Sequence, residues 1–394
     1  MKWTAFLYQL GGGAPRSVLA YLTIIKGQGD QVTVAAQKDE DGVLALYRET
    51  VDGLVLGKTF KHLWDEHRFL AAYGALRNMR RLIRRERPDC VLAVGEVNGF
   101  FLSHLCRRLA LPLIILIAGG DLSKNGYLAE KWEWGQVICF SEENREVILA
   151  HHPDMPVQVI ANRIQASPAF FDAETHYRDL KKVNVLITSR LVPGKIESVL
   201  RFLEELEESG YGPRLHVKIA GKGEALPFLR RQIQERFEQR MDVELLGHVD
   251  DLRPLFAWAH LAAGKGRSVV EPILLGRIGC VLTEEGPACV CSLGSLETLA
   301  HYNFSGRGMG SPSERDRVAA VIGELLKGTA DLPALARCAE GVRRRYSAEY
   351  LSKQWERALS ACMEAPRGKR RTWTPVLPRY LQFIFMKAKH KRGR

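Results

Sequence analysis

Short apolar runs alternate with amphipathic segments along most of the chain, and this alternation restricts the fold more than any other feature. The run at residues 183–188 is typical of a buried strand, and residues 196–208 follow it with Val199, Leu200, Leu203 and Leu206 on one helical face. Strands that alternate with helices form parallel sheets covered by those helices. The sequence therefore predicts an α/β fold.

The expected strands fall into two sets, separated by a stretch of mixed polarity at residues 162–182. The first set comprises residues 3–10, 32–36, 90–94, 113–117, 137–140 and 157–160. The second comprises residues 183–188, 215–220, 243–246, 260–263 and 280–282. A chain of 394 residues has room for two domains that each bury a core, so we expect the two sets to form separate domains.

Two cations directly follow the first strand of the second set. Arg190 and Lys195 lie in the segment Ser-Arg-Leu-Val-Pro-Gly-Lys, between this strand and the next helical pattern. Ligands of open α/β sheets bind at the carboxyl ends of strands. An arginine and a lysine at this position indicate a site for an anion, although charge at a strand end also suits a solvated loop.

Two further loops of the second set have the same strand-to-helix position. Gly221 opens the turn Gly-Lys-Gly after residues 215–220. Gly266, Arg267 and Ser268 follow residues 260–263 and begin a helical pattern that has Glu271 in its first turns. A helix amino terminus attracts phosphate, and a carboxylate accepts hydrogen bonds from ribose hydroxyls. Together with the two cations, these residues indicate a nucleoside-diphosphate site.

With these elements in this order, residues 1 to about 363 resemble a family 4 glycosyltransferase of the GT-B fold. The resemblance implies two Rossmann-like domains that face each other across a cleft. Residues 1–163 would bind the acceptor, residues 183–346 would bind the nucleotide sugar, and a helix over 347–363 would pack back on the first domain. It also implies transfer with retention of configuration, and neither a metal ion nor another cofactor besides the substrate nucleoside-diphosphate sugar.

The resemblance gives roles to individual residues. Arg190 and Lys195 match the pair that holds the donor diphosphate, where they would stabilise the charge of the leaving group. Glu271 matches the carboxylate that binds ribose. Gly12 and Gly13 match the glycine-rich loop after the first strand, which faces the donor diphosphate and the acceptor. Gly221, Gly266, Arg267 and Ser268 complete the expected donor site.

One position departs from the family pattern. The family carries two glutamates separated by seven residues, and Ala263 stands where the first of them, near the donor sugar, is expected. Lys265 and Arg267 are the nearby side chains that can replace this glutamate. Each of them can equally be a solvated surface charge. The departure leaves open a relative without catalytic activity.

Asp121 is the candidate for the acceptor side of the reaction. It ends Ile-Ala-Gly-Gly-Asp after the apolar run 113–117, in the place of the loop that approaches the transferred sugar in the resembled family. The carboxylate can orient or deprotonate the acceptor hydroxyl. It can equally cap a short helix that begins at Ser123.

The positive charge of the chain is concentrated in two places. Ten of the cations that give the net charge of +12 lie in residues 365–394, which contain no acid, so residues 1–364 carry only +2. A second set follows helical spacing, at Arg77, Arg80, Arg81, Arg84, Arg85 and Arg87. The tail interleaves its cations with aromatic residues, so we expect contact with an anionic membrane and no nucleic acid.

The cysteine pattern and the hydropathy limit the cellular location that we expect for the protein. The eight cysteines form no C-x-x-C pair and are expected to be reduced thiols in the cytoplasm. The apolar start at residues 1–10 is too short for a signal sequence, and no segment approaches about 18 uninterrupted apolar residues. We expect a cytoplasmic protein associated peripherally with the inner face of the cell membrane.

The sequence thus predicts transfer of a sugar from a nucleoside-diphosphate sugar to a lipid-linked or saccharide acceptor, in the synthesis of a cell-surface polysaccharide or glycolipid. Two alternatives stay open. A sugar-nucleotide epimerase of the same fold would need no acceptor, and a catalytically silent subunit would bind a nucleotide sugar or a partner without turnover.

Overall fold

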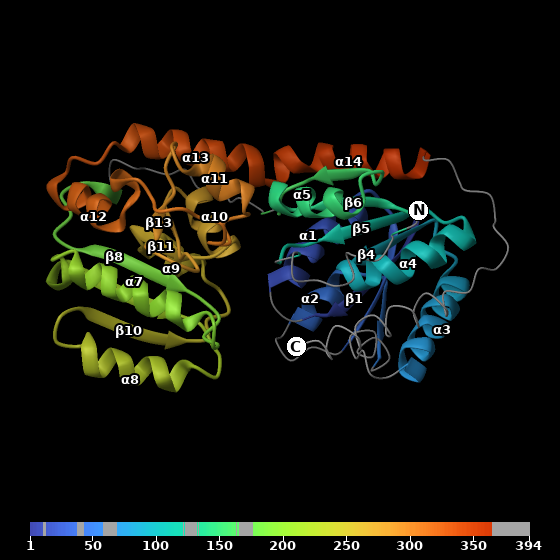
Figure 1. Cartoon of the computed structure of the whole chain (residues 1–394), viewed down its shortest axis with the longest axis horizontal. Coiled ribbons are helices and arrows are strands. Elements are labelled where there is room, and N and C mark those ends of the chain that lie inside the picture. The colour runs from blue at the N-terminus through green and yellow to red at the C-terminus, as the bar shows by residue number, and fades with distance from the viewer. Residues whose placement is uncertain are drawn as a thin grey trace. The chain divides into compact units, whose positions relative to one another are not determined.

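The computed structural model describes residues 1–10, 13–37, 43–57, 69–120, 122, 132, 134–162, 164 and 176–364. These residues divide into two compact units (Figure 1). The described part of unit 1 lies within residues 1–162 and 351–364, and unit 2 is Ile164–Tyr350. The expected strand–helix alternation is confirmed in both units.

In unit 1, the described strands form one parallel sheet in the order β3-β2-β1-β4-β5-β6-β7. The strands are β1 (Lys2–Gln9), β2 (Gln31–Gln37), β3 (Gly53–Leu56), β4 (Cys90–Val94), β5 (Leu113–Ile117), β6 (Gln136–Cys139) and β7 (Val157–Val159). The helices are α1 (Gly13–Gly27), α2 (Val43–Thr50), α3 (Phe69–Glu86), α4 (Glu96–Leu109), α5 (Glu142–His151) and α14 (Ala348–Glu364). The order is that of a Rossmann-like sheet, in which the direction of winding changes between β1 and β4.

Helix α14 packs into the core of unit 1. Its buried face, which includes Leu351, Trp355 and Leu359, joins the apolar cluster of α1, β1 and β2. The Trp355 ring lies 4.5 Å from that of Tyr21, centroid to centroid. The Tyr21 hydroxyl donates to the Ala161 carbonyl at 2.6 Å, so one aromatic residue connects α1, α14 and the chain after β7.

Unit 2 repeats the sheet order. Its described strands follow β10-β9-β8-β11-β12-β13, and all neighbours are parallel except β12 and β13. The strands are β8 (Val183–Thr188), β9 (Leu215–Ala220), β10 (Asp242–Gly247), β11 (Leu261–Gly264), β12 (Ile278–Val281) and β13 (Cys289–Val290). The helices are α7 (Ile196–Glu208), η3 (Gly212–Arg214), α8 (Leu226–Arg236), α9 (Arg253–Trp258), α10 (Arg267–Leu274), α11 (Leu296–His301), η4 (Glu314–Asp316), α12 (Val318–Lys327) and α13 (Leu332–Tyr346).

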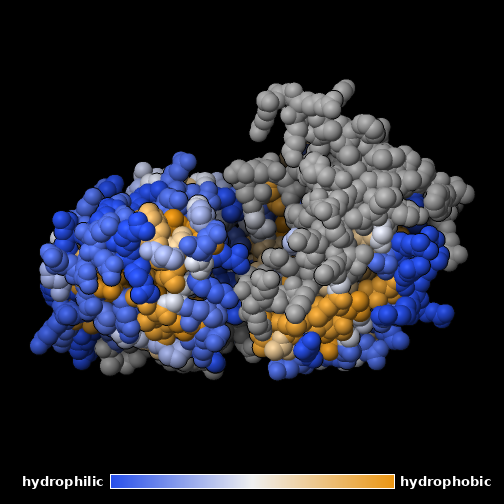
Figure 2. Space-filling model, turned by 90° about the horizontal axis from the view of Figure 1, so that it is seen from below, coloured by the Kyte–Doolittle hydropathy of each residue, from blue (hydrophilic) through white to orange (hydrophobic). Residues whose placement is uncertain are grey.

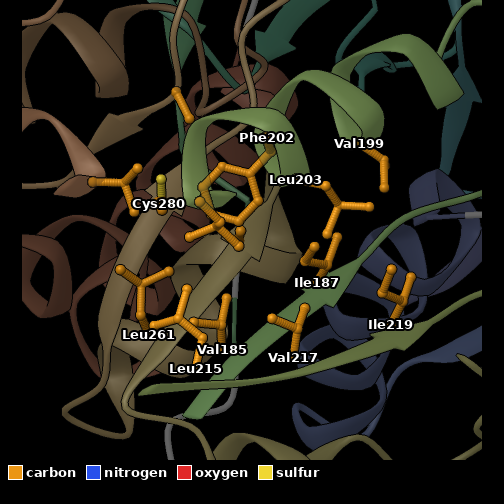
Figure 3. Close-up of a cluster of buried hydrophobic side chains, with 14 of the residues drawn as sticks. Val185, Ile187, Val199, Phe202, Leu203, Leu215, Val217, Ile219, Leu261 and Cys280 are labelled. Carbon is orange, nitrogen blue, oxygen red and sulfur yellow. The ribbon is translucent and has the colours of Figure 1, made fainter. Parts of the chain in front are cut away.

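The core of unit 2 lies between the sheet and α7. Phe202 and Leu203 of α7 are fully buried beside Val185 and Ile187 of β8 and Val217 of β9 (Figure 3). The period of α7 places these side chains on one face, and alternate residues of each strand meet them. Because the sheet and helix are fixed by this contact, the loop that joins β8 to α7 begins and ends on rigid elements.

Two observed strands are absent from the expected set. Strand β3 is a half-buried edge strand of four residues, and β13 has two residues and runs antiparallel to β12. Neither segment is long enough to show a period. Both are strands because an existing sheet edge offers them hydrogen bonds, which is a tertiary cause.

All eight cysteines are buried and free of disulfides. Among the helices that the structure describes, none combines the length and the apolar character needed to cross a bilayer.

Replacing Trp355 with Ala should lower the free energy of unfolding of unit 1 by about 3–5 kcal/mol, because it leaves a large cavity against Tyr21. The matched control is Lys353→Ala on the exposed face of the same helix, expected to stay within about 0.5 kcal/mol of the wild type. Urea titration monitored by far-UV circular dichroism, a signal that does not rely on tryptophan fluorescence, measures the stability of both variants. Equal midpoints for the two variants would show that α14 contributes little to the core.

Candidate functional site

The predicted donor residues of unit 2 gather at one edge of its sheet. The loops after β8, β9 and β11 all leave the carboxyl ends of parallel strands, and β8 and β11 are neighbours. The winding of the sheet reverses between these two strands, because β9 and β10 lie on one side and β12 on the other. Ligands of such sheets bind at this reversal point.

The loop after β8 carries Arg190 and Lys195. Both side chains reach solvent, and the loop ends at Lys195, directly before α7. Partial loss of hydration lowers the pKa of Lys195, and the positive charge of Arg190 lowers it further, against the opposing effect of Glu284. The two cations are therefore close enough to repel each other, and an anion bound between them would relieve the repulsion.

The loop after β9 holds the loop after β8 in place. The Leu191 N–H donates to the Lys222 carbonyl at 2.9 Å, and the Ala225 N–H donates to the Leu191 carbonyl at 2.9 Å. A Cβ on Gly221 would lie 1.9 Å from the Ser189 carbonyl oxygen, so this position has no room for a side chain. Gly221 therefore allows the two loop backbones to approach closely, and its own N–H donates to the Gly247 carbonyl.

The loop after β11 brings a helix amino terminus to the same edge. Gly266, with φ of 60°, precedes α10, and its N–H donates to the Phe304 carbonyl at 2.7 Å. The first N–H groups of α10, from Arg267 and Ser268, have no carbonyl partner within the helix. They carry the positive end of its dipole, which suits a phosphate.

Glu271 lies one turn into α10 and is held by Arg267. The Arg267 Nε donates to the Glu271 Oε1 at 2.7 Å, and both side chains are half-buried. A carboxylate accepts several hydrogen bonds, so this ion pair leaves Glu271 able to accept from a ligand hydroxyl. Arg267 is thus a positioning residue for Glu271, a relation that its i, i+4 spacing already indicates.

Further charged side chains surround this edge. Burial is the largest influence on the pKa of Lys265 and lowers it, Glu284 acts in the opposite direction, and Lys195, Arg307 and Arg201 lower it further. Arg201 of α7 donates to the Glu284 carbonyl. Of these three residues, only Glu284 has a position that could have indicated it from the sequence, because it lies shortly after β12, whereas Arg201 and Arg307 follow no local pattern.

Ala263 is fully buried. It lies within β11, pairs with Ile187 of β8 and belongs to the hydrophobic core of unit 2. The next residue, Gly264, has no room for a side chain, since a Cβ there would lie 2.9 Å from the Thr188 carbonyl oxygen. Lys265 is therefore the first residue after β11 whose side chain reaches the sheet edge.

The candidates of unit 1 are only partly described. Gly12 and Asp121 lie outside the described residues, and Gly13 is the first residue of α1. The described residues bring together Arg190, Lys195, Gly221, Gly266, Arg267, Ser268 and Glu271 on one edge of unit 2. Among the described residues, no group of three or more His, Cys, Asp or Glu is arranged to hold a metal ion.

No model of a protein family matches the chain, and no curated protein matches it. Solved structures match nearly all of it. Anabaena HepE in complex with UDP-glucose is 18% identical, covers 92% of this chain and 100% of its own, and has a TM-score of 0.65. A glycosyltransferase from Rickettsia africae is 11% identical over 92% of this chain and 99% of its own, with a TM-score of 0.68. The chain has the GT-B fold.

The GT-B fold is shared by proteins of more than one activity. A putative UDP-N-acetylglucosamine 2-epimerase from Listeria monocytogenes is 14% identical over 95% of this chain and 99% of its own, with a TM-score of 0.56. The fold therefore does not decide the function, which depends on the side chains at sites such as the β8 and β11 loops.

Replacing Gly221 with Ala should displace the β8 loop, because its Cβ would overlap the Ser189 carbonyl oxygen. We expect a loss of about 1–3 kcal/mol in stability and, in calorimetry, a marked loss of affinity for the nucleoside diphosphate whose binding is proposed below. Gly74→Ala in α3 is the control, because nothing lies within 4 Å of its added Cβ. Wild-type affinity in Gly221→Ala would contradict the role given to this contact.

Proposed function

We propose that the protein is a retaining glycosyltransferase that moves a sugar from a nucleoside-diphosphate sugar to a lipid-linked or saccharide acceptor, in the synthesis of a cell-surface polysaccharide or glycolipid. One observation carries the proposal. Arg190 and Lys195 follow β8, and α10 begins after the neighbouring strand β11, so both loops leave the unit 2 sheet at its reversal point. That combination is suited to a diphosphate.

The proposed chemistry follows from where charge develops. As the bond between sugar and diphosphate breaks, the leaving diphosphate gains negative charge, and Arg190, Lys195 and the α10 amino terminus stabilise it. Glu271, held by Arg267, accepts hydrogen bonds from the ribose. We propose Asp121 as the residue that orients or deprotonates the acceptor hydroxyl. No step requires a metal ion.

Two other functions predict different results in one assay. An epimerase would convert the nucleotide sugar without an acceptor, and the likeness to the Listeria protein is the observation that favours it. A silent subunit would bind the nucleotide sugar without turnover, and the buried Ala263 favours that reading. Incubation of the protein with nucleotide sugars alone separates them: slow hydrolysis to free nucleoside diphosphate and unaltered sugar supports the transferase.

Lys195→Ala should weaken UDP binding by about 10- to 100-fold, because it removes a charge-assisted contact to the diphosphate. Lys195→Arg keeps the charge and should retain most of the affinity. In the wild type, affinity should fall as the pH rises through the lowered pKa of Lys195, since only the protonated amine attracts the anion. The arginine variant should show a smaller alkaline loss. Unchanged affinity in Lys195→Ala, measured by calorimetry, would remove this residue from the site.

We also propose that the protein associates with an anionic membrane surface through α3 and residues 365–394. The exposed face of α3 carries Arg77, Arg80, Arg81, Arg84 and Arg85, and its opposite face is buried. Figure 2 shows hydrophilic residues at this end of unit 1, beside a band of apolar residues. Each cation near an anionic bilayer contributes about 1 kcal/mol. The tail lies outside the described residues.

Deleting residues 365–394 should abolish sedimentation with anionic liposomes and leave UDP affinity unchanged, because the proposed donor site is confined to unit 2. If binding persists after the deletion, the double variant Arg80→Glu/Arg84→Glu should remove it. Arg230→Glu/Arg231→Glu on α8 is the matched control, since these arginines are equally exposed but belong to unit 2. Equal binding by all variants would exclude both surfaces as membrane contacts.

A further inference from the structure

The loop after β11 has exchanged a carboxylate position for a cationic one. At the position where the resembled family carries its first glutamate, Ala263 is sealed in the core, and Gly264 leaves no space for any side chain. Lys265 is thus the first side chain that this loop presents at the sheet edge, and it is half-buried. Its ammonium can only donate hydrogen bonds, whereas a carboxylate can only accept them.

The surroundings of Lys265 hold it at this edge. The Leu282 N–H donates to the Gly264 carbonyl at 2.9 Å, and the Gly266 N–H donates to the Phe304 carbonyl at 2.7 Å, so the backbone is fixed on both sides of Lys265. The Glu284 N–H donates to the Gly306 carbonyl at 2.9 Å. The loops that contain Lys265, Glu284 and Arg307 are therefore tied into one surface beside Lys195.

The charge at this surface exceeds what a diphosphate needs. A nucleoside diphosphate joined to a neutral sugar carries one negative charge on each phosphate, and Arg190 and Lys195 already match these. Lys265, Arg201 and Arg307 add further positive charge at this surface, and Glu284 offsets only part of it. Burial lowers the pKa of Lys265, which means that the ammonium has lost hydration that an anionic ligand can replace.

We propose that Lys265 recognises a carboxylate on the donor sugar, so that the protein takes a nucleoside-diphosphate uronic acid in preference to a neutral hexose. The inference rests on the proposed function, since it assumes that a nucleotide sugar binds at this edge. A carboxylate both accepts from the ammonium and balances its charge, whereas a hydroxyl can only accept. Such a charge-assisted contact corresponds to a preference of about 10- to 100-fold.

The test uses the full-length protein and donors that differ only at the sugar carboxylate. Calorimetry with UDP, GDP, ADP and dTDP first identifies the base. For uridine, the matched donors are UDP-glucose and UDP-glucuronic acid, and for guanosine they are GDP-mannose and GDP-mannuronic acid. The wild type should prefer the uronic acid by about tenfold or more. Lys265→Met keeps the apolar stem and should abolish this preference while changing the affinity for the bare nucleoside diphosphate by less than about twofold.

Two further variants make the result specific. Lys265→Arg keeps the charge and should retain the preference, which a purely structural role would not predict. Lys327→Met, in the last turn of α12, removes the same charge at an exposed position of unit 2 and should leave the preference unchanged. Thermal unfolding of each variant confirms that the fold is intact.

Three results would overturn the inference. A wild type that binds both donors equally would do so directly. Equal losses in Lys265→Met for the bare diphosphate and for both donors would assign Lys265 to the diphosphate instead, and the proposed function would stand. Failure of every nucleoside diphosphate to bind the wild type would reject the proposed function itself, and with it this inference.

Discussion

The close approach of two backbone loops in unit 2 determines where the cations of the site lie. Gly221 and Gly223 bring the β9 loop against the carbonyl oxygens of Ser189 and Leu191, at distances that exclude any Cβ. Backbone hydrogen bonds between the loops hold that contact. Because the β8 loop is fastened between a central strand and α7, Arg190 leaves it at a fixed position. A site built this way is preorganised for the diphosphate that is proposed to bind there.

This preorganisation has an electrostatic cost. Partial burial is the largest cause of the lowered pKa of both Lys195 and Lys265. Arg190 lowers the pKa of Lys195 further, and Lys195, Arg307 and Arg201 lower that of Lys265 further. Glu284 offsets part of the repulsion for both. Like charges held together destabilise the empty protein, and the anionic groups of a ligand that bind beside them recover this free energy. The arrangement is typical of a functional site, where local stability is lost in favour of ligand affinity.

The first six strands of both units follow one sheet order, so the backbone alone does not say which unit carries the proposed nucleotide site. In both, the winding reverses beside the first strand of the unit. Only side chains distinguish such sites, because the same fold supports many activities. In unit 2 the paired cations, the α10 amino terminus and the Arg267–Glu271 ion pair coincide at that point. The proposed function therefore rests on these residues, and the GT-B fold supplies the scaffold that aligns them.

The sequence by itself determined the strand–helix order and the local parts of the site. The run Val183–Thr188, the helix Ile196–Glu208 and the spacings of Arg190, Lys195 and Glu271 are all set by residues close together in the chain. Period and spacing report such relations directly. Tertiary structure alone decided the rest. It buried Ala263 and left no room for a side chain at Gly221. It also brought Lys265 close to Glu284 and Arg307, and it paired the short strands β3 and β13 with longer ones. These features depend on segments far apart in the sequence, and no periodic pattern in the sequence reports such contacts.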